Sequence, residues 1–341
     1  MTSIATLGSH CALQVLKGAK DEGFKTLLVC EKKRERLYQR FGFIDELILV
    51  DSFKEITDQK CATKLKNENA IIIPHGTLIA QMSSTEIESI STPIFGNKWI
   101  LRWESDRSKK EELMHASKLN VPKSLPTPKE INGLVIAKRH GAAGGKGYFL
   151  TTSEKDYKKK RDKLITQGII KGDSDLYLQE YAFGVSAYLQ YFYSPIKNEI
   201  EFFGVDRRYE SDIDGLGRIP SSQQMEIDNI PSFNVIGNSP LVLRESLLDE
   251  VYSMGERFVD AAKRLVPPGM TGPFCLEGVY DENGKFTSFE FSARIVAGTN
   301  LYVNGSPYSD LIYEESMSMG RRIAREIKNA KNEEQLSKII T

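Results

Sequence analysis

Two glutamates in the C-terminal part of the sequence have the type and spacing of a metal-binding pair. Glu277 lies in the run 274–280 and Glu290 in the run 285–292, and both runs have the composition of β-strands. Between them, Asn283-Gly284 is the preferred dipeptide for a two-residue hairpin turn. That turn would place Glu277 opposite Glu290, and a four-residue turn would leave them diagonal on the same face.

These two carboxylates would repel each other without a compensating charge. Facing side chains on paired strands have Cβ atoms about 5 Å apart, where like charges are destabilising. Mg²⁺ typically takes one or two carboxylates together with phosphate oxygens, so a divalent cation is the expected compensation. The opposite face carries Leu276, Phe289 and Phe291, which are expected to pack on a core. Two solvated glutamates, or a pair that shares a proton, are the alternatives.

The segment 138–148 is rich in glycine and lies between two predicted strands. It does not match a Walker A loop, because Lys146 is followed by Gly147 and no helix follows. The segment does not match the dinucleotide-binding fingerprint either, because that motif also requires a helix after the glycines. We predict a β-hairpin whose backbone N–H groups close over phosphate oxygens, with positive charge from Lys138 and Lys146. A flexible surface hairpin is the alternative.

The elements that position these residues fall into three parts. Short apolar runs alternate with helical patterns over the first hundred residues, which predicts a parallel, doubly wound sheet. A helical connector follows at 97–120, and aromatic and β-branched runs typical of antiparallel strands begin near residue 130. We predict an α/β protein (α+β in its second half) with a Rossmann-like domain over 1–97, a small lobe with the glycine-rich loop over 98–190 and a large lobe with the carboxylates over 191–341.

Composition narrows the choice of partners and compartment. The chain has 46 Lys and Arg against 46 Asp and Glu, so it has no net charge that would favour binding to nucleic acid or to an anionic membrane. Its four cysteines form no CxxC pair, which is typical of reduced thiols. No apolar stretch approaches the ~20 residues that span a bilayer, and no signal-peptide core precedes the first strand. A cytoplasmic protein is expected.

The chain resembles the ATP-grasp superfamily in the order of three features. These are a lysine before the glycine hairpin, the strand end at 179–181 and the two glutamates of the second hairpin. More specifically, the chain resembles the archaeal, formate-dependent formaminoimidazole carboxamide ribonucleotide (FAICAR) synthetases of purine (IMP) biosynthesis. The resemblance extends over essentially the whole chain. Among the runs that carry it are ATLGSH at 5–10, PHG at 74–76, LRWESDR at 101–107, DRRYES at 206–211 and MGRRIAREI at 319–327.

The resemblance implies an ATP-dependent ligase that forms a carbon–nitrogen bond. Formate would be phosphorylated to formyl phosphate, and the amine of aminoimidazole carboxamide ribonucleotide (AICAR) would attack it. The resemblance also implies that Lys138 and Arg294 act in catalysis and that Glu277 and Glu290 bind Mg²⁺ or Mn²⁺. The residues implied to bind ATP are Lys138, Gly141, Gly144, Gly145, Lys146, Gly147, Gln179, Glu180, Tyr181 and Glu210, and those implied to bind AICAR are Ser9, His10, Gly76, Thr77 and Asn238.

The residues themselves also indicate a ligand edge in the first domain. The segments 8–10 and 75–77 each follow a predicted strand. In a parallel sheet those ends lie along one edge, where ligands of doubly wound folds bind. Ser9 could cap the following helix, whose free N–H groups suit a phosphate. A structural or surface role is the alternative for a lone histidine such as His10.

Three residues differ from the pattern of the family. Thr77 stands where serine is usual, Cys11 where serine or threonine is expected, and Asp212 where asparagine is expected. An ATP-grasp ligase for a different acid or amine is therefore an alternative, as is a nucleotide-binding paralogue without catalysis. A protein kinase is not supported, because the sequence contains neither HRD nor DFG. Aromatic residues over 188–203 suggest a subunit interface, and so a homo-oligomer.

Overall fold

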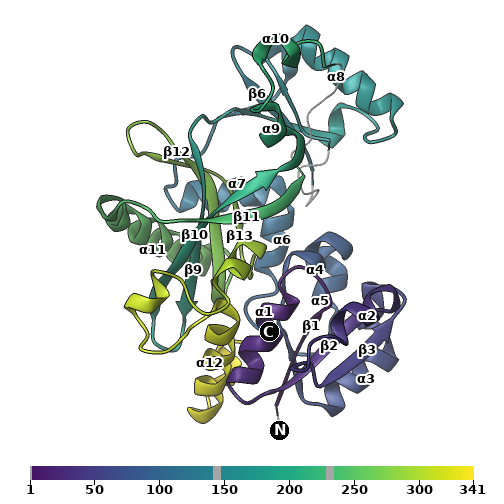
Figure 1. Cartoon of the computed structure of the whole chain (residues 1–341), viewed down its shortest axis with the longest axis vertical. Coiled ribbons are helices and arrows are strands. Elements are labelled where there is room, and N and C mark those ends of the chain that lie inside the picture. Colours follow the sequence, from purple (N-terminus) through teal and green to yellow (C-terminus); the bar gives the residue numbers. More distant parts are fainter. Residues whose placement is uncertain (1, 141–146, 228–233) are drawn as a thin grey trace.

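The computed structural model of the chain describes residues 2–140, 147–227 and 234–341. The predicted phosphate-loop residues Gly141, Gly144, Gly145 and Lys146 lie outside the described residues. A parallel sheet occupies one end of the molecule, a large antiparallel sheet the middle and a small antiparallel sheet the other end (Figure 1). The predicted α/β architecture is therefore confirmed.

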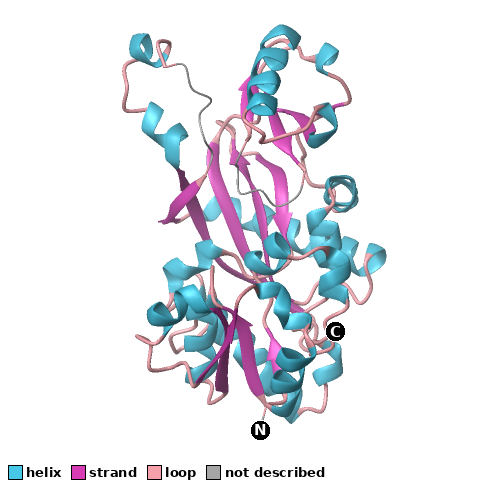
Figure 2. Cartoon of the chain, turned by 90° about the vertical axis from the view of Figure 1, so that its right-hand side faces the viewer, coloured by secondary structure: helices cyan, strands magenta, loops and turns pink. Residues whose placement is uncertain are grey.

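The N-terminal sheet is parallel, with strands in the order β3-β2-β1-β4, and helices cover both of its faces (Figure 2). Leu27, Leu28 and Val29 of the inner strand β2 are fully buried, as expected where both faces of a parallel sheet are covered. Its elements are β1 (Ser3–Leu7), α1 (Ala12–Asp21), β2 (Lys25–Glu31), α2 (Glu35–Tyr38), β3 (Glu46–Val50), α3 (Gln59–Asn67), β4 (Ala70–Ile72), α4 (Gly76–Gln81) and α5 (Ser84–Glu88).

Two connector helices, α6 (Ile100–Ser105) and α7 (Arg107–Ala116), lead from this domain to the small sheet. Asp106 ends α6 and caps α7, because its carboxylate accepts the Lys109 N–H at 3.0 Å. Leu113 and Met114 of α7 are buried in the core beside the large sheet. The connector is thus packed against the large sheet and is well placed to contribute side chains to a site there.

The small sheet has the order β5-β8-β6-β7 and is antiparallel throughout. Strands β6 and β7 flank the glycine-rich segment, as predicted. The elements are β5 (Ser124–Leu125), β6 (Val135–Arg139), β7 (Phe149–Thr151), α8 (Glu154–Thr166) and β8 (Leu176–Glu180). Tyr157 and Leu164 of α8 are buried against this sheet, which gives the small lobe a core of its own.

The large sheet has the order β11-β10-β9-β12-β13. Its inner strand β12 is buried along its whole length, and helix α11 packs Val251, Phe258 and Ala262 on the same core. These residues are spaced to lie on one side of a helix. The elements are β9 (Val185–Ser194), β10 (Glu199–Glu210), α9 (Ser211–Leu216), α10 (Ser221–Gln224), β11 (Val235–Leu241), α11 (Leu248–Leu265), β12 (Gly272–Tyr280), β13 (Phe286–Ser292) and α12 (Met319–Asn332).

Helix α12 returns to the N-terminal domain and lies against α1 (Figure 1). A Cβ atom on Gly18 of α1 would lie 2.1 Å from the Arg321 nitrogen, and one on Gly320 of α12 would lie 2.3 Å from the Gln14 oxygen. Only glycine permits this backbone contact. The first and last helices therefore hold the N-terminal domain on the large sheet.

Strand β9 begins at Val185, so it lies in the large sheet on both sides of the proposed boundary between residues 190 and 191. Tyr188, Phe192 and Phe202 are buried within the chain. These aromatic residues therefore do not support the expected subunit interface. Across the described ranges, helices both long and apolar enough to cross a membrane are absent.

Candidate active site

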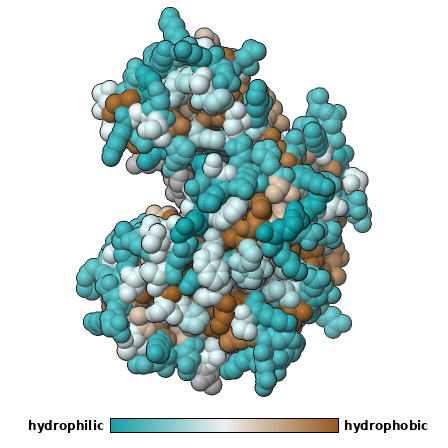
Figure 3. Space-filling model, turned by 180° about the vertical axis from the view of Figure 1, so that it is seen from behind, coloured by the Kyte–Doolittle hydropathy of each residue, from teal (hydrophilic) through white to brown (hydrophobic). Residues whose placement is uncertain are grey.

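A cavity of about 750 Å³ lies where the three parts of the molecule meet. The space-filling surface is hollowed between the small lobe and the N-terminal domain (Figure 3). The predicted residues that line the cavity are Ser9, His10, Gly76, Thr77, Lys138, Gln179, Glu180, Tyr181, Glu210, Asn238, Glu277, Glu290 and Arg294. Gly147 precedes the lining residue Tyr148 and has a left-handed backbone, with φ at 79°. The fold thus brings the candidates of all three parts to one place.

The hairpin of β12 and β13 sets Glu277 opposite Glu290, as predicted, but by neither predicted turn. The Asp281 N–H donates to the Lys285 oxygen at 3.1 Å, and the Asp281 carboxylate accepts the Lys285 N–H at 2.9 Å, so this pair encloses the three residues 282–284. A β-bulge then adds a residue, Phe289, to β13 and restores the pairing of the glutamates. The bulge also turns Phe289 to the cavity, where it packs beside Tyr188, so the prediction that it lies on the face opposite the glutamates was wrong.

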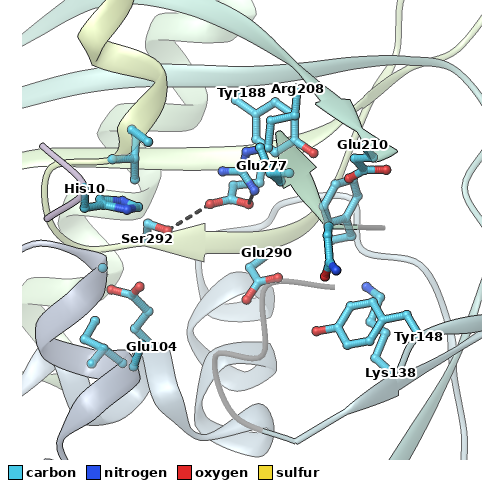
Figure 4. Close-up of a pocket in the computed structure, with 18 of the residues that line it drawn as sticks. His10, Glu104, Lys138, Tyr148, Tyr188, Arg208, Glu210, Glu277, Glu290 and Ser292 are labelled. Atoms are coloured by element: carbon cyan, nitrogen blue, oxygen red, sulfur yellow. Dashed lines mark hydrogen bonds and ion pairs between the residues drawn. The ribbon is translucent and has the colours of Figure 1, made fainter. Parts of the chain in front are cut away.

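Glu277 is held by two side chains of the large sheet. The Arg208 guanidinium lies 2.9 Å from one carboxylate oxygen, and the Ser292 hydroxyl donates to the other at 2.8 Å. Arg208 also lies over the ring of Tyr188, 3.8 Å from its centre. A carboxylate anchored at both oxygens in this way has a defined orientation toward the cavity (Figure 4).

Glu290 is paired with the connector. The Lys110 ammonium donates to its Oε1, and Arg107 Nη1 lies 3.9 Å from the same oxygen. Burial alone would raise the pKa of Glu290, but the positive charges of Lys110, Arg107 and Lys138 outweigh it and lower that pKa. Glu290 is therefore ionised at neutral pH.

These ion pairs compensate the facing carboxylates in a way that the sequence did not predict. Arg208 and Lys110 already supply the opposite charge. The donor set nevertheless fits a divalent cation, because two carboxylates on neighbouring strands reach the same cavity, and hard cations prefer such oxygen ligands. Glu277 and Glu290 are the residues that would hold it.

Lys138 reaches the cavity from β6, facing the two glutamates from the small lobe (Figure 4). Its ammonium donates to Gln179 Oε1 at 2.8 Å and lies 5.0 Å from the centre of the Phe289 ring. Burial, helped by the nearby charges of Arg107 and Lys110, lowers the pKa of Lys138 to about 7. A phosphate beside it would favour the charged form.

The segment 179–181, which the resemblance implies to bind ATP, uses part of its backbone for hydrogen bonds within the small lobe. The Glu180 N–H donates to the Lys123 oxygen at 2.8 Å, and the Tyr181 N–H donates to the Leu134 oxygen at 3.0 Å. These two donors are therefore not available to a base. Glu210 approaches from β10, and its burial raises its pKa to about 7 despite the positive charge of Arg208.

His10 lies in the turn between β1 and α1 with a left-handed backbone, at φ 55°. Its ring stacks on that of His75, with centres 5.6 Å apart. A Cβ atom on Gly76 would lie 2.9 Å from the His10 ring, so glycine allows this approach. Burial between the cavity walls, with the charge of Arg294, lowers the pKa of His10, and the neutral ring prevails at physiological pH.

His75 and Ser9 link the loops at this edge of the sheet through side-chain hydrogen bonds. His75 Nδ1 accepts the Thr77 N–H at 3.2 Å, so Nε2 must carry the proton that it shares with the Leu7 oxygen at 2.9 Å. Helix α1 is preceded by Cys11, and the Ser9 hydroxyl accepts from Arg34 at 3.1 Å. The prediction that Ser9 caps α1 is therefore wrong, although Ser9 lines the cavity.

Asn238 is anchored by a buried carboxylate. Its side-chain amide donates to Asp206 at 2.7 Å, and Gln190 donates to the other oxygen of that group. Of the three residues that differ from the family, only Thr77 lines the cavity within the described residues. Cys11 is buried at the start of α1, and Asp212 lies in α9.

Several residues that line the cavity were not predicted from the sequence. Arg208 shares a strand face with Glu210, two residues away, so strand alternation was the available signal. Glu104 and Lys110 are brought to the cavity by the connector, and nothing local in the sequence indicates their buried partners. Only the three-dimensional packing of α6 and α7 on the large sheet reveals them.

Comparison with known proteins agrees with this geometry. Residues 4–125 match a family model described as a protein of unknown function (DUF1246), and residues 156–341 match a domain of unknown function (DUF1297). A 5-formaminoimidazole-4-carboxamide-1-(beta)-D-ribofuranosyl 5'-monophosphate synthetase of Nitrosopumilus maritimus is 68% identical over 341 residues, which is 100% of both chains.

Solved structures agree as well. The crystal structure of the IMP biosynthesis protein PurP from Thermococcus kodakaraensis superposes with a TM-score of 0.79 at 30% identity, covering 99% of this chain and 100% of that one. An ADP complex of N5-carboxyaminoimidazole ribonucleotide synthetase has a TM-score of 0.66 at 14% identity, with 96% and 77% covered, and shares the ATP-grasp fold. The chain is an ATP-dependent ligase with an ATP-grasp fold, and it belongs to the FAICAR synthetase family.

Proposed function

We propose that this protein formylates AICAR to FAICAR with formate and ATP, releasing ADP and phosphate, in purine (IMP) biosynthesis. The observation that carries the proposal is the convergence of three sets of side chains on one cavity. Glu277 and Glu290 come from the large sheet, Lys138 from the small lobe, and His10 and Thr77 from the N-terminal sheet. A ligase that joins an acid to an amine needs both reactants and the nucleotide at one place.

In the proposed reaction an oxygen of formate bonds to the γ-phosphorus of ATP, and ADP leaves. The AICAR amine then attacks the carbon of formyl phosphate, the carbon–oxygen bond breaks, and phosphate leaves as the nitrogen loses a proton. Lys138 would neutralise the transferred phosphoryl group, and Arg294 would hold the acid. Lys138, Gly147, Gln179, Glu180, Tyr181 and Glu210 would bind ATP, together with Gly141, Gly144, Gly145 and Lys146.

Glu277 and Glu290 would hold Mg²⁺ or Mn²⁺. Within the described ranges no cluster of three or more His, Cys, Asp and Glu side chains forms a complete metal site, and a cation bound by two carboxylates completes its shell with phosphate and water oxygens. Such a cation would offset charge on the phosphates.

AICAR would bind at the carboxyl ends of β1 and β4, against Ser9, His10, Gly76, Thr77 and Asn238. The neutral ring of His10 and the hydroxyl of Thr77 suit polar contacts with a ribonucleotide. The ring of His10 is held on His75, so it is oriented before the ligand arrives. A homo-oligomer in the cytoplasm remains part of the proposal.

The test is to incubate the purified protein with ATP, Mg²⁺, formate and AICAR and to follow ADP and the formylated nucleotide. Formation of FAICAR only when all four are present is the expected result. If a different acid or amine triggers ADP release and formate does not, the protein is another carboxylate–amine ligase. Nucleotide binding without turnover of any acid would indicate a paralogue that has lost catalysis.

A further inference from the structure

Helix α6 sends a buried carboxylate into the cavity wall, and the proposed reaction gives it no task. Glu104 is 6% exposed. It lies on the side of His10 and Ser292 rather than on the side of Lys138 (Figure 4). Burying a carboxylate costs free energy unless its oxygens accept hydrogen bonds or pair with a cation. The burial of Glu104 raises the pKa of its carboxyl group.

Both oxygens of Glu104 are engaged by neighbouring residues at the end of β13. Oε1 lies 2.9 Å from Arg294 Nη2, and Oε2 accepts the Ala293 N–H at 2.9 Å. Glu104 thus binds the backbone and the side chain of one short segment at the same time. This leaves the Arg294 guanidinium little freedom to rotate, because one of its nitrogens is fixed to a group that is itself anchored.

The other donors of Arg294 are less well satisfied. Its Nε is buried without a hydrogen-bond partner among the described residues, and Nη1 lies 3.4 Å from the Ile295 oxygen. A buried donor without an acceptor is destabilising, and it is retained where a ligand supplies the acceptor. Arg294 is among the residues that line the cavity, so its guanidinium is placed to meet an anionic ligand there.

We infer that Glu104 is a positioning residue, which holds the Arg294 guanidinium in the cavity wall so that it meets an oxygen of the small carboxylate or of the acyl phosphate made from it. This inference rests on the proposed function, because it takes the acid substrate as the anion. Glu104 acts through Arg294 and has no separate contact with the reacting atoms.

The first test is Glu104→Gln, which keeps the shape and one acceptor but removes the charge. A guanidinium displaced by about 1 Å lowers kcat roughly 100-fold. The KM for formate is not expected to rise, because Arg294 keeps its charge and loses its neutralising partner. A raised KM for formate with unchanged kcat would overturn the positioning role, as would full activity.

Glu201→Gln is the matched control. Glu201 is also buried and pairs with an arginine, Arg322, but it joins α12 to β10 and does not line the cavity. Its loss lowers the unfolding temperature, while kcat per folded molecule stays within about twofold. If both variants lower kcat equally, Glu104 is an ordinary structural residue and the inference fails.

The second test is a double-mutant cycle with Arg294→Met. If Glu104 acts through Arg294, the double variant is as slow as Arg294→Met alone, because no guanidinium remains to be positioned. Multiplied losses would show an independent role, such as accepting the proton of the amine, and would overturn the inference. If the wild-type protein does not use formate, the proposed function fails, and the cycle is run with the acid that does release ADP.

Discussion

The two ends of the cavity are built differently. At the carboxylate end, Glu277 and Glu290 stand on paired strands, and each is held by a cationic side chain from another element. At the acceptor end, His10 and Thr77 stand on turns after β1 and β4, and His10 depends on a left-handed backbone and on stacking with His75. Strand pairing fixes the first end, whereas tertiary contacts between loops fix the second.

The largest effect is expected at the carboxylate end. Glu290→Gln removes the negative charge of a proposed metal ligand and leaves Lys110 and Arg107 without their partner. We expect turnover to fall on the order of 1,000-fold, since charge stabilisation at the transferred phosphoryl group is lost. Steady-state formation of FAICAR measures this. Glu282→Gln in the exposed loop of the same hairpin is the control and should leave turnover intact. Full activity of Glu290→Gln would contradict the assignment.

The acceptor end should respond in binding rather than in chemistry. His10→Ala removes a side chain that lines only the N-terminal side of the cavity. We expect the KM for AICAR to rise about 10- to 100-fold, which is the scale of one or two lost polar contacts, with the KM for ATP unchanged. His115→Ala, at an exposed position of α7, is the control. An equal rise in both KM values would show that the two ends are not separate.

A pH profile separates the two ends in another way. Burial lowers the pKa of Lys138 to about 7, so the charged fraction of free enzyme falls as pH rises through that value. Phosphates bind the charged form, so kcat/KM for ATP should fall above pH 7, by up to about tenfold per pH unit. Lys138→Arg remains charged and should lose the part of this fall that Lys138 causes. Identical profiles for the two proteins would mean that Lys138 does not set the pH dependence.

The smallest effects are expected from the residues that differ from the family. Thr77→Ser removes one methyl group at the cavity, worth about 0.8 kcal/mol, so the KM for AICAR should change by no more than about fourfold. Cys11→Ser should leave this KM unchanged but lower the free energy of unfolding by roughly 1–3 kcal/mol, because a hydroxyl replaces a buried thiol. Kinetics and urea unfolding measure the two quantities. A large KM change in Cys11→Ser would place Cys11 functionally at the ligand.

The fold followed from the sequence wherever local pattern determines position. The alternation of apolar runs and helical patterns over the first hundred residues correctly predicted the parallel sheet. The facing of Glu277 and Glu290 was also predicted, although a bulge at Phe289 produces it instead of the turn at Asn283-Gly284. A bulge depends on packing of the neighbouring strand and so leaves little trace in the local pattern.

What the sequence could not provide was the set of partners. Lys110 lies 180 residues from Glu290, and Ala293 lies 189 residues from Glu104. Their contacts arise because the connector packs on the large sheet, a tertiary arrangement that periodicity does not encode. Ser9 is not the helix cap because α1 begins at Ala12 with Cys11 as its N-cap, two residues beyond Ser9, and the Ser9 hydroxyl instead accepts from Arg34.

The central claim is that formate is activated by phosphorylation in this cavity before the amine attacks. The most direct test uses formate labelled with heavy oxygen, together with ATP and AICAR, and mass spectrometry of the released phosphate. If formyl phosphate is the intermediate, the carbon–oxygen bond breaks in the second step and one labelled oxygen appears in the phosphate. Phosphate without label, released together with formylated nucleotide, would contradict the account.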